Sequence, residues 1–106
     1  MNGRGKRAKG AGGERELASI LSDHLGQAVN RNLGQARDGG DDITIQQFRI
    51  EVKRHERLQV MRWCEQVEKT CGAGDVPIVA FRQNGEEWRV VLKLADFIPM
   101  LRDSLT

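Results

Sequence analysis

The stretch that decides the fold is residues 42–53, DITIQQFRIEVK. Apolar and polar residues alternate over 42–46, and they alternate again over 48–53. This period of two is typical of strands, because successive side chains of a strand point to opposite faces of the sheet. The two runs are separated only by a tight connection at Gln46 and Gln47. The stretch therefore predicts an antiparallel hairpin.

Three charged residues of this hairpin indicate chemistry. Alternation places Glu51 and Lys53 on one face of the second strand, and the hairpin brings Asp42 to within a few residues of Glu51 at the same end of the sheet. Two converging carboxylates repel each other unless a cation lies between them, and Mg²⁺ or Mn²⁺ prefers oxygen ligands. A neighbouring lysine can stabilise developing charge or orient an attacking water. These residues predict a hydrolytic metal site, with a salt-bridged strand face as the alternative.

The remaining elements follow from the same kind of pattern. Helical spacing of apolar residues predicts three helices, over 13–25, 58–71 and 96–105. Further extended segments are expected at 28–33, 76–82 and 88–94, and 76–82 is apolar enough to be covered on both faces. The predicted order is α-β-β-β-α-β-β-α on one mixed sheet flanked by helices. This is an α/β fold, and 106 residues suit one compact domain.

Basic residues gather at the N-terminus, although the formal net charge of the chain is only +2. Residues 1–12 are rich in glycine and contain no acid, which predicts a flexible basic arm preceding a single domain at 13–106. We expect the arm to contact DNA phosphates without reading bases. Its expected DNA-binding residues are Lys6, Arg7 and Lys9.

The cysteines and the apolar runs bear on location. Cys64 and Cys71 lie seven residues apart in a predicted helix, so roughly 10.5 Å of helix axis would separate them. That exceeds the limit of about 7 Å between the Cα atoms of a disulfide, so both are expected to be reduced thiols in a cytoplasmic protein. The longest apolar run, 76–81, is much shorter than the ~20 residues of a membrane-spanning helix.

A resemblance to a known family covers residues 9 to 93. Asp42 followed by Glu51-Val52-Lys53 resembles the D…EXK signature of the PD-(D/E)XK nucleases. Together with the GEREL run over 13–17, the pattern is similar to archaeal-type Holliday-junction resolvases and related small phage endonucleases. The resemblance implies a restriction-endonuclease-like core and a Mg²⁺-dependent endonuclease that hydrolyses DNA phosphodiester bonds, in which Mn²⁺ would substitute for Mg²⁺.

The resemblance also implies a role for each matching residue. Asp42 and Glu51 would bind the metal, and Val52 would add its backbone carbonyl as a ligand. Glu14 would complete the metal shell through water, and Lys53 would act on the water or the phosphate. The implied catalytic set is therefore Glu14, Asp42, Glu51 and Lys53.

Several of these assignments have competitors. Arg15 and Arg37 match basic positions that hold DNA phosphates, but Arg31 could reach the same region as Arg37. Asp41 competes with Asp42 as the metal ligand, and Glu16 competes with Glu14. For Glu14 there is also a purely structural reading, since acids in the first turn of a helix complement its dipole.

The substrate and the assembly are expectations from the resemblance alone. The expected substrate is branched DNA or a four-way junction, which a homodimer would cut during DNA recombination. The expected location is the cytoplasm of a prokaryotic, archaeal or phage-infected cell. The alternatives are a restriction-like, nicking or repair endonuclease, or a non-catalytic DNA-binding module on the same fold.

Overall fold

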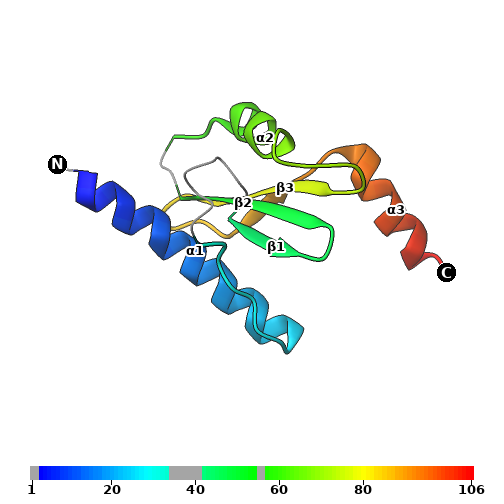
Figure 1. Cartoon of the computed structure of the whole chain (residues 1–106), viewed down its shortest axis with the longest axis horizontal. Helices are drawn as coiled ribbons and strands as arrows, with labels where there is room; N and C mark the ends of the chain where they lie inside the picture. Colours follow the sequence, from blue (N-terminus) through cyan, green and yellow to red (C-terminus); the bar gives the residue numbers. More distant parts are fainter. Residues whose placement is uncertain (1–2, 34–41, 55–56) are drawn as a thin grey trace.

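The fold is a four-stranded mixed sheet covered by helices, as seen in a computed structural model (Figure 1) that describes residues 3–33, 42–54 and 57–106, with side chains from residue 12 onward. Strands follow one another across the sheet in the order β1-β2-β3-β4. The predicted α/β class is confirmed. The elements are α1 (Gly3–Leu25), β1 (Ile43–Ile45), β2 (Phe48–Arg54), α2 (Val60–Glu68), β3 (Val76–Arg82), β4 (Arg89–Val91) and α3 (Leu94–Ser104).

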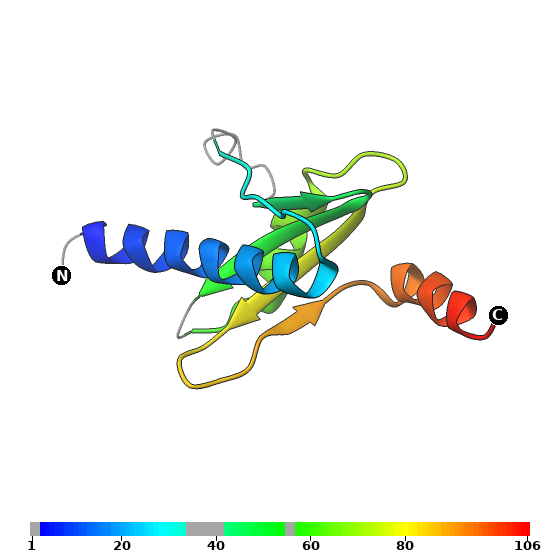
Figure 2. The same cartoon turned by 90° about the horizontal axis from the view of Figure 1, so that it is seen from below.

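Helices α1 and α2 lie on opposite faces of the sheet (Figures 1 and 2). On the α1 face, Leu17 packs with Ile50 and Ala80. On the α2 face, Trp63 packs with Val79. Val79 and Ala80 are consecutive residues of β3 and are 0% and 1% exposed, so this strand is buried on both faces, as its apolar sequence predicted.

The hairpin predicted from residues 42–53 forms with the expected register. Ile43 lies opposite Ile50, and Gln46 turns the chain with a φ of 51°, in the left-handed region. Strand β1 has three residues and β2 has seven, so the second half of β2 extends past the end of β1. There β2 pairs with β3 alone, in parallel and through the crossover helix α2. Within the described residues, no strand therefore pairs with this half of β2 on the β1 side.

The segment 28–33, expected to be a strand, forms only a single bridge, between Arg31 and Ile43. Hydrogen bonds that involve side chains, and not a ladder of backbone bonds, hold this segment. The Val29 amide donates to the Ser22 Oγ at 2.8 Å, and the Asn32 side chain donates to Thr44 at 2.8 Å. The predicted strand at 88–94 shortens to β4, and the last helix begins at Leu94 rather than at residue 96.

Helix α2 is shorter than the predicted range of 58–71. It ends at Glu68, because the amides of Thr70 and Cys71 bond to carbonyls three residues back and tighten the chain into a turn. Cys71 therefore lies beyond the helix rather than on one helix face with Cys64. Both cysteines are free, as predicted, and burial raises the pKa of the Cys64 thiol.

Helix α1 begins at Gly3, ten residues before the predicted start, so the segment expected to be a flexible arm is helical. Helix growth onto an existing helix avoids the cost of nucleation, and the alanines, lysines and arginines of this segment are strong helix formers that offset its glycines. Glu14 is consequently in the middle of α1, and the explanation by a first-turn dipole does not apply to it.

Within the described residues, none of the helices combines the length and the apolar character needed to cross a lipid bilayer.

Candidate active site

Asp42 occupies the corner where β1 stops and β2 continues. Its amide donates to the Ile50 carbonyl at 3.0 Å, which extends the hairpin register by one step. Its carboxylate Oδ2 accepts a hydrogen bond from the Val52 amide at 2.8 Å. The Asp42 carboxylate thus accepts the hydrogen bond that a backbone carbonyl of a longer β1 would accept from β2. Asp42 is held beside Glu51 by this bond, as the hairpin predicted.

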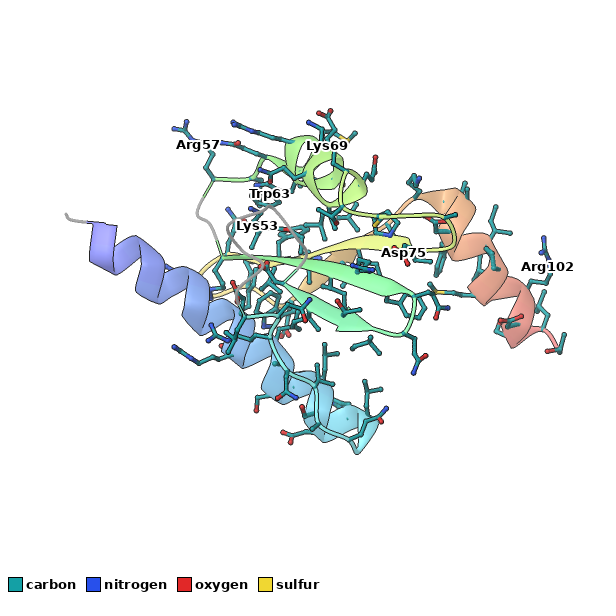
Figure 3. All side chains as sticks on the ribbon, viewed as in Figure 1. Lys53, Arg57, Trp63, Lys69, Asp75 and Arg102 are labelled. Carbon is teal, nitrogen blue, oxygen red and sulfur yellow. The ribbon has the colours of Figure 1, made fainter. Side chains whose placement is uncertain are left out.

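Glu51 and Lys53 project from β2 toward the α2 side of the sheet. They lie opposite Val79 and Phe81 of β3, and the Phe81 ring packs at 5.8 Å from the ring of Trp63. Lys53 and Trp63, labelled in Figure 3, are both on the side of the sheet that α2 covers. The Lys53 Nζ lies 3.3 Å from Glu51 Oε1, and the two side chains are only 18% and 15% exposed. The pair is therefore partly sheltered from water.

The electrostatic environment of Glu51 favours its protonated form. Burial is the largest cause, and the negative charge of Asp42 is the second. Lys53 opposes both effects, while Glu14 adds a smaller repulsion. Together they raise the pKa of Glu51 to about 7. A cation placed beside this carboxylate would relieve the repulsion, and a pKa perturbed by burial and by a neighbouring charge is common at functional sites.

Glu14 reaches the same corner from α1. Burial raises the pKa of Glu14, and so do the charge of Asp42 and a side-chain hydrogen bond with Asp42. Arg31 and Arg15 oppose these effects, and Arg31 Nη1 lies 3.6 Å from Glu14 Oε1. The negative charge of Asp42 thus acts on both Glu14 and Glu51. Glu14 approaches Asp42 from a helix outside the hairpin, and its role in the metal shell stays a prediction.

Glu16 is held elsewhere. Its carboxylate accepts hydrogen bonds from Arg82 Nε at 3.1 Å, Arg82 Nη2 at 3.3 Å and Trp88 Nε1 at 2.9 Å. We call these three residues the α1 anchor, because they tie α1 to β3 and to the turn that follows it. The anchor was not predicted, since no local pattern links residues so far apart in sequence. It removes Glu16 as a competitor for the role of Glu14.

Gly13 allows α1 to approach β2 closely enough for Glu14 to reach Asp42. The residue is buried, and a Cβ atom at this position would overlap the Cγ of Arg54. Gly13 and Glu16 therefore fix the helix on either side of Glu14.

The donor set suits a hard divalent cation. Asp42, Glu51 and Glu14 supply carboxylate oxygens, and repulsion from Asp42 adds to the effect of burial in raising the pKa of both glutamates. Among the described residues, no three acidic, histidine or cysteine side chains already converge as a ready metal cage. Mg²⁺ commonly takes one or two carboxylates and completes its shell with water and substrate. The Val52 amide bonds to Asp42, and the ligand role of the Val52 carbonyl stays a prediction.

The predicted DNA-binding residues divide into two groups. Arg15 is exposed on α1, one residue from Glu14. Arg37 and Asp41 lie outside the described residues. Lys6, Arg7 and Lys9 lie on the first turns of α1, with side chains that are likewise outside the description. The structure brings Arg31 to Glu14, the position that the sequence offered only as a competitor for Arg37.

One comparison with known proteins finds a match, to a protein-family model. The model of the family described as "Phage putative PDDEXK endonuclease" matches residues 5–104, nearly the whole chain. No curated protein and no solved structure matches the chain.

Proposed function

Since the chain belongs to the family of phage PDDEXK endonucleases, we propose that it is a metal-dependent endonuclease that hydrolyses DNA phosphodiester bonds with Mg²⁺. Family membership supports nuclease activity in general, and the proposal extends it to the metal and the nucleic acid. The observation that carries this extension is the environment of Glu51. Its pKa is raised to about 7 by burial and by Asp42, while Lys53 lies 3.3 Å away.

Each residue of the corner has a distinct task in this proposal. Asp42 and Glu51 hold the metal with the Val52 carbonyl, and Glu14 contributes through water. The bound metal would supply Lewis acidity and lower the pKa of a water molecule. Lys53 presents its ammonium to the scissile phosphate, where it stabilises negative charge that develops during hydrolysis. Because Lys53 is only 18% exposed, that charge is screened less than it would be in open water.

The finer parts of the proposal concern substrate and assembly. We propose branched DNA, in particular a four-way junction, because the pattern from Glu14 to Lys53 resembles junction-resolving enzymes. A homodimer would present two such sites for paired incisions. Two free cysteines suit a reducing cytoplasm. Mn²⁺ is expected to replace Mg²⁺, since both are hard cations with oxygen ligands.

The decisive experiment is a cleavage assay with labelled four-way junction, flap, nicked and plain duplex DNA, each with Mg²⁺, with Mn²⁺ and with EDTA. We expect metal-dependent cleavage that Asp42→Asn, Glu51→Gln and Lys53→Met each reduce by at least about 100-fold, the scale of a lost charge-stabilising group. Matched controls are Asp103→Asn and Lys69→Met, on exposed residues of α3 and just after α2. A wild-type chain that cuts none of these DNAs with either metal would refute the nuclease proposal.

Metal binding can be followed without activity. Mg²⁺ should raise the Tm of the wild-type chain, because it binds only the folded corner, and Glu51→Gln should remove most of that rise. An equal rise in both proteins would place the metal elsewhere.

A second candidate is a DNA-binding module without catalysis. Its supporting observation is the run of basic residues without an acid over residues 4–9, on the first turns of α1, which suits DNA binding alone. Tight junction binding with no cleavage in the same assay would favour it. If the chain cuts nicked or plain duplex DNA better than the junction, it is instead a nicking, restriction-like or repair endonuclease.

A further inference from the structure

An open cavity of about 450 Å³ lies beside the candidate active site, between α1 and the segment after it. Its polar lining consists of Arg15, Ser19, Ser22, Asn30 and Arg31. This lining carries two guanidinium groups and no carboxylate. It is therefore suited to an anion.

A second surface cavity has the opposite balance of charged residues. The cavity beside the α1 anchor is lined by Arg82 together with Glu16, Glu86 and Glu87, so acids outnumber bases there. A polyanion is repelled from that cavity and attracted to the one that contains Arg15 and Arg31.

The wall that carries Arg31 is fixed before any ligand arrives. On one side, Ser22 Oγ accepts from the Val29 amide at 2.8 Å and donates to the Ala18 carbonyl at 2.8 Å. On the other side, the Asn32 amide donates to the Asp42 carbonyl at 2.7 Å, and Arg31 itself bridges to β1. An irregular segment held on both sides presents its side chains with little further loss of entropy on binding.

The cavity adjoins the carboxylates of the active site. Arg31 Nη1 lies 3.6 Å from Glu14 Oε1, which is longer than a charge-assisted hydrogen bond. From there, Arg15, Ser19 and Ser22 follow one side of α1 over roughly 10.5 Å. A DNA strand carries one negative charge for roughly every 3.4 Å along the duplex axis. A strand that passes Glu14 and runs along α1 therefore brings its neighbouring phosphates over this cavity.

We propose that this cavity binds backbone phosphates of the DNA strand adjacent to the scissile phosphate, with Arg31 as its central cation. Arg31 and Arg15 pair with phosphate oxygens, and Ser19 and Asn30 donate hydrogen bonds. The inference deepens the proposed nuclease function and rests on it. Because phosphates carry no base identity, the subsite sets the position of the strand and not its sequence preference.

The test is binding of the full chain to a fluorescein-labelled four-way junction in EDTA, measured by fluorescence anisotropy over a range of salt concentrations. Arg31→Gln should weaken binding and lower the slope of log K against log salt by about 0.7–0.9, the value of one lost phosphate contact. Arg31→Lys should restore the slope. Arg102→Gln is the control, since Arg102 is exposed on α3, far from α1 (Figure 3).

The Glu14→Gln background separates phosphate binding from a merely structural ion pair. If Arg31 only neutralises Glu14, Arg31→Gln has no effect on the salt slope once Glu14 is neutral. If Arg31 binds phosphate, the slope falls in both backgrounds. An unchanged slope in the wild-type background overturns the inference outright.

A second variant avoids any dependence on the folding of Arg31→Gln. Ser19 is exposed, so Ser19→Asp introduces a carboxylate at the cavity without disturbing the core. It should raise the Kd for the junction at least about fivefold through repulsion of phosphate, whereas Ser104→Asp on α3 should not. Equal Kd values for the two variants contradict the subsite. Binding is read without metal, so a failure of cleavage refutes only the nuclease proposal, whereas an unchanged slope refutes only the subsite.

Discussion

Glu51 is a largely buried carboxylate beside a second carboxylate, that of Asp42. Its pKa is about 7 in the folded chain, against 4.5 for an ordinary glutamate. Between these two values the folded chain holds a proton that the unfolded chain has released. The stability of the metal-free protein therefore falls as pH rises from 4.5 to about 7, and the whole penalty is present above that window.

Glu51→Gln should make the metal-free protein more stable at about pH 8, because glutamine keeps the shape without the buried charge. Near pH 4.5, where the folded wild type is protonated, the two proteins should be nearly equal in stability. Urea denaturation in EDTA at both pH values measures the difference. The matched control is Glu65→Gln on the exposed face of α2. A wild type that is as stable as Glu51→Gln at the higher pH would show that ionisation of Glu51 does not destabilise the folded chain.

At the residue level, alternation alone predicted that Glu51 and Lys53 share a face and that Asp42 lies near them. Glu14 is different, because nothing in the period of a helix says which of its residues meets a strand from a distant hairpin. The resemblance supplied Glu14 as a site residue; the structure shows that Glu14 interacts with Asp42, and its role stays a prediction. Arg31 was only a competitor for Arg37 in the sequence, because the irregular segment that carries it has no periodic signal.

At the level of elements, the position of α1 decides whether Glu14 reaches Asp42. The α1 anchor joins Glu16 to Arg82 and Trp88, and the anchor is partly exposed, with the Glu16 side chain 42% accessible. Glu16→Ala should cost about 1 kcal/mol of stability, the order of a solvent-screened ion pair with hydrogen bonds. It should also lower kcat more than it raises KM, because Glu14 is displaced while the DNA surface remains. Denaturation and steady-state cleavage measure the two effects.

The control for the anchor is Glu86→Ala, which removes a more exposed pairing with Arg89 within one turn. It should leave kcat unchanged. If Glu16→Ala and Glu86→Ala behave alike, the anchor does not position α1.

Two adjacent glycines of α1 offer a matched pair of variants. Nothing lies within 4 Å of a Cβ atom added at Gly12, whereas one added at Gly13 would overlap Arg54. Gly12→Ala should therefore stabilise the helix by about 0.5–1 kcal/mol, the usual gain of alanine over glycine. Gly13→Ala should lose that gain and reduce cleavage, because α1 must move away from β2. Thermal melts and cleavage rates distinguish the two variants. An equal gain in stability in both would mean that α1 does not pack tightly against β2 at Gly13.

For the whole molecule, hydrophobic pattern was enough to predict the layers of the fold. The continuous apolar run of β3 required cover on both faces, and α1 and α2 provide it. The ends of elements were harder, because they depend on bonds between distant segments. In the segment 28–33, the Val29 amide bonds to Ser22 of α1 and not to a neighbouring strand, and α1 continues to Gly3 because an existing helix can grow without a new nucleation step.

The uneven charge of the whole molecule gives the last prediction. The net charge is only +2, yet the first turns of α1 carry Lys6, Arg7 and Lys9 without an acid, and this part of α1 extends beyond the sheet (Figures 1 and 2). Changing all three to glutamine should reduce the salt slope of junction binding by about 2–3, close to one unit for each lost phosphate contact. Binding to other DNA structures should weaken by a similar factor, because phosphates are common to all of them.

The comparison that makes this prediction specific is a second triple change of equal charge, at Lys69, Lys93 and Arg102. Lys69 follows α2, Lys93 directly precedes α3 and Arg102 lies on α3, and α3 is at the opposite end of the molecule from the first turns of α1 (Figures 1 and 3). If net charge alone attracted DNA, both triples would lower the slope equally. If the DNA follows α1 past the active site, only the first triple lowers it, and cleavage at saturating DNA remains at the wild-type rate because Glu14, Asp42, Glu51 and Lys53 are untouched.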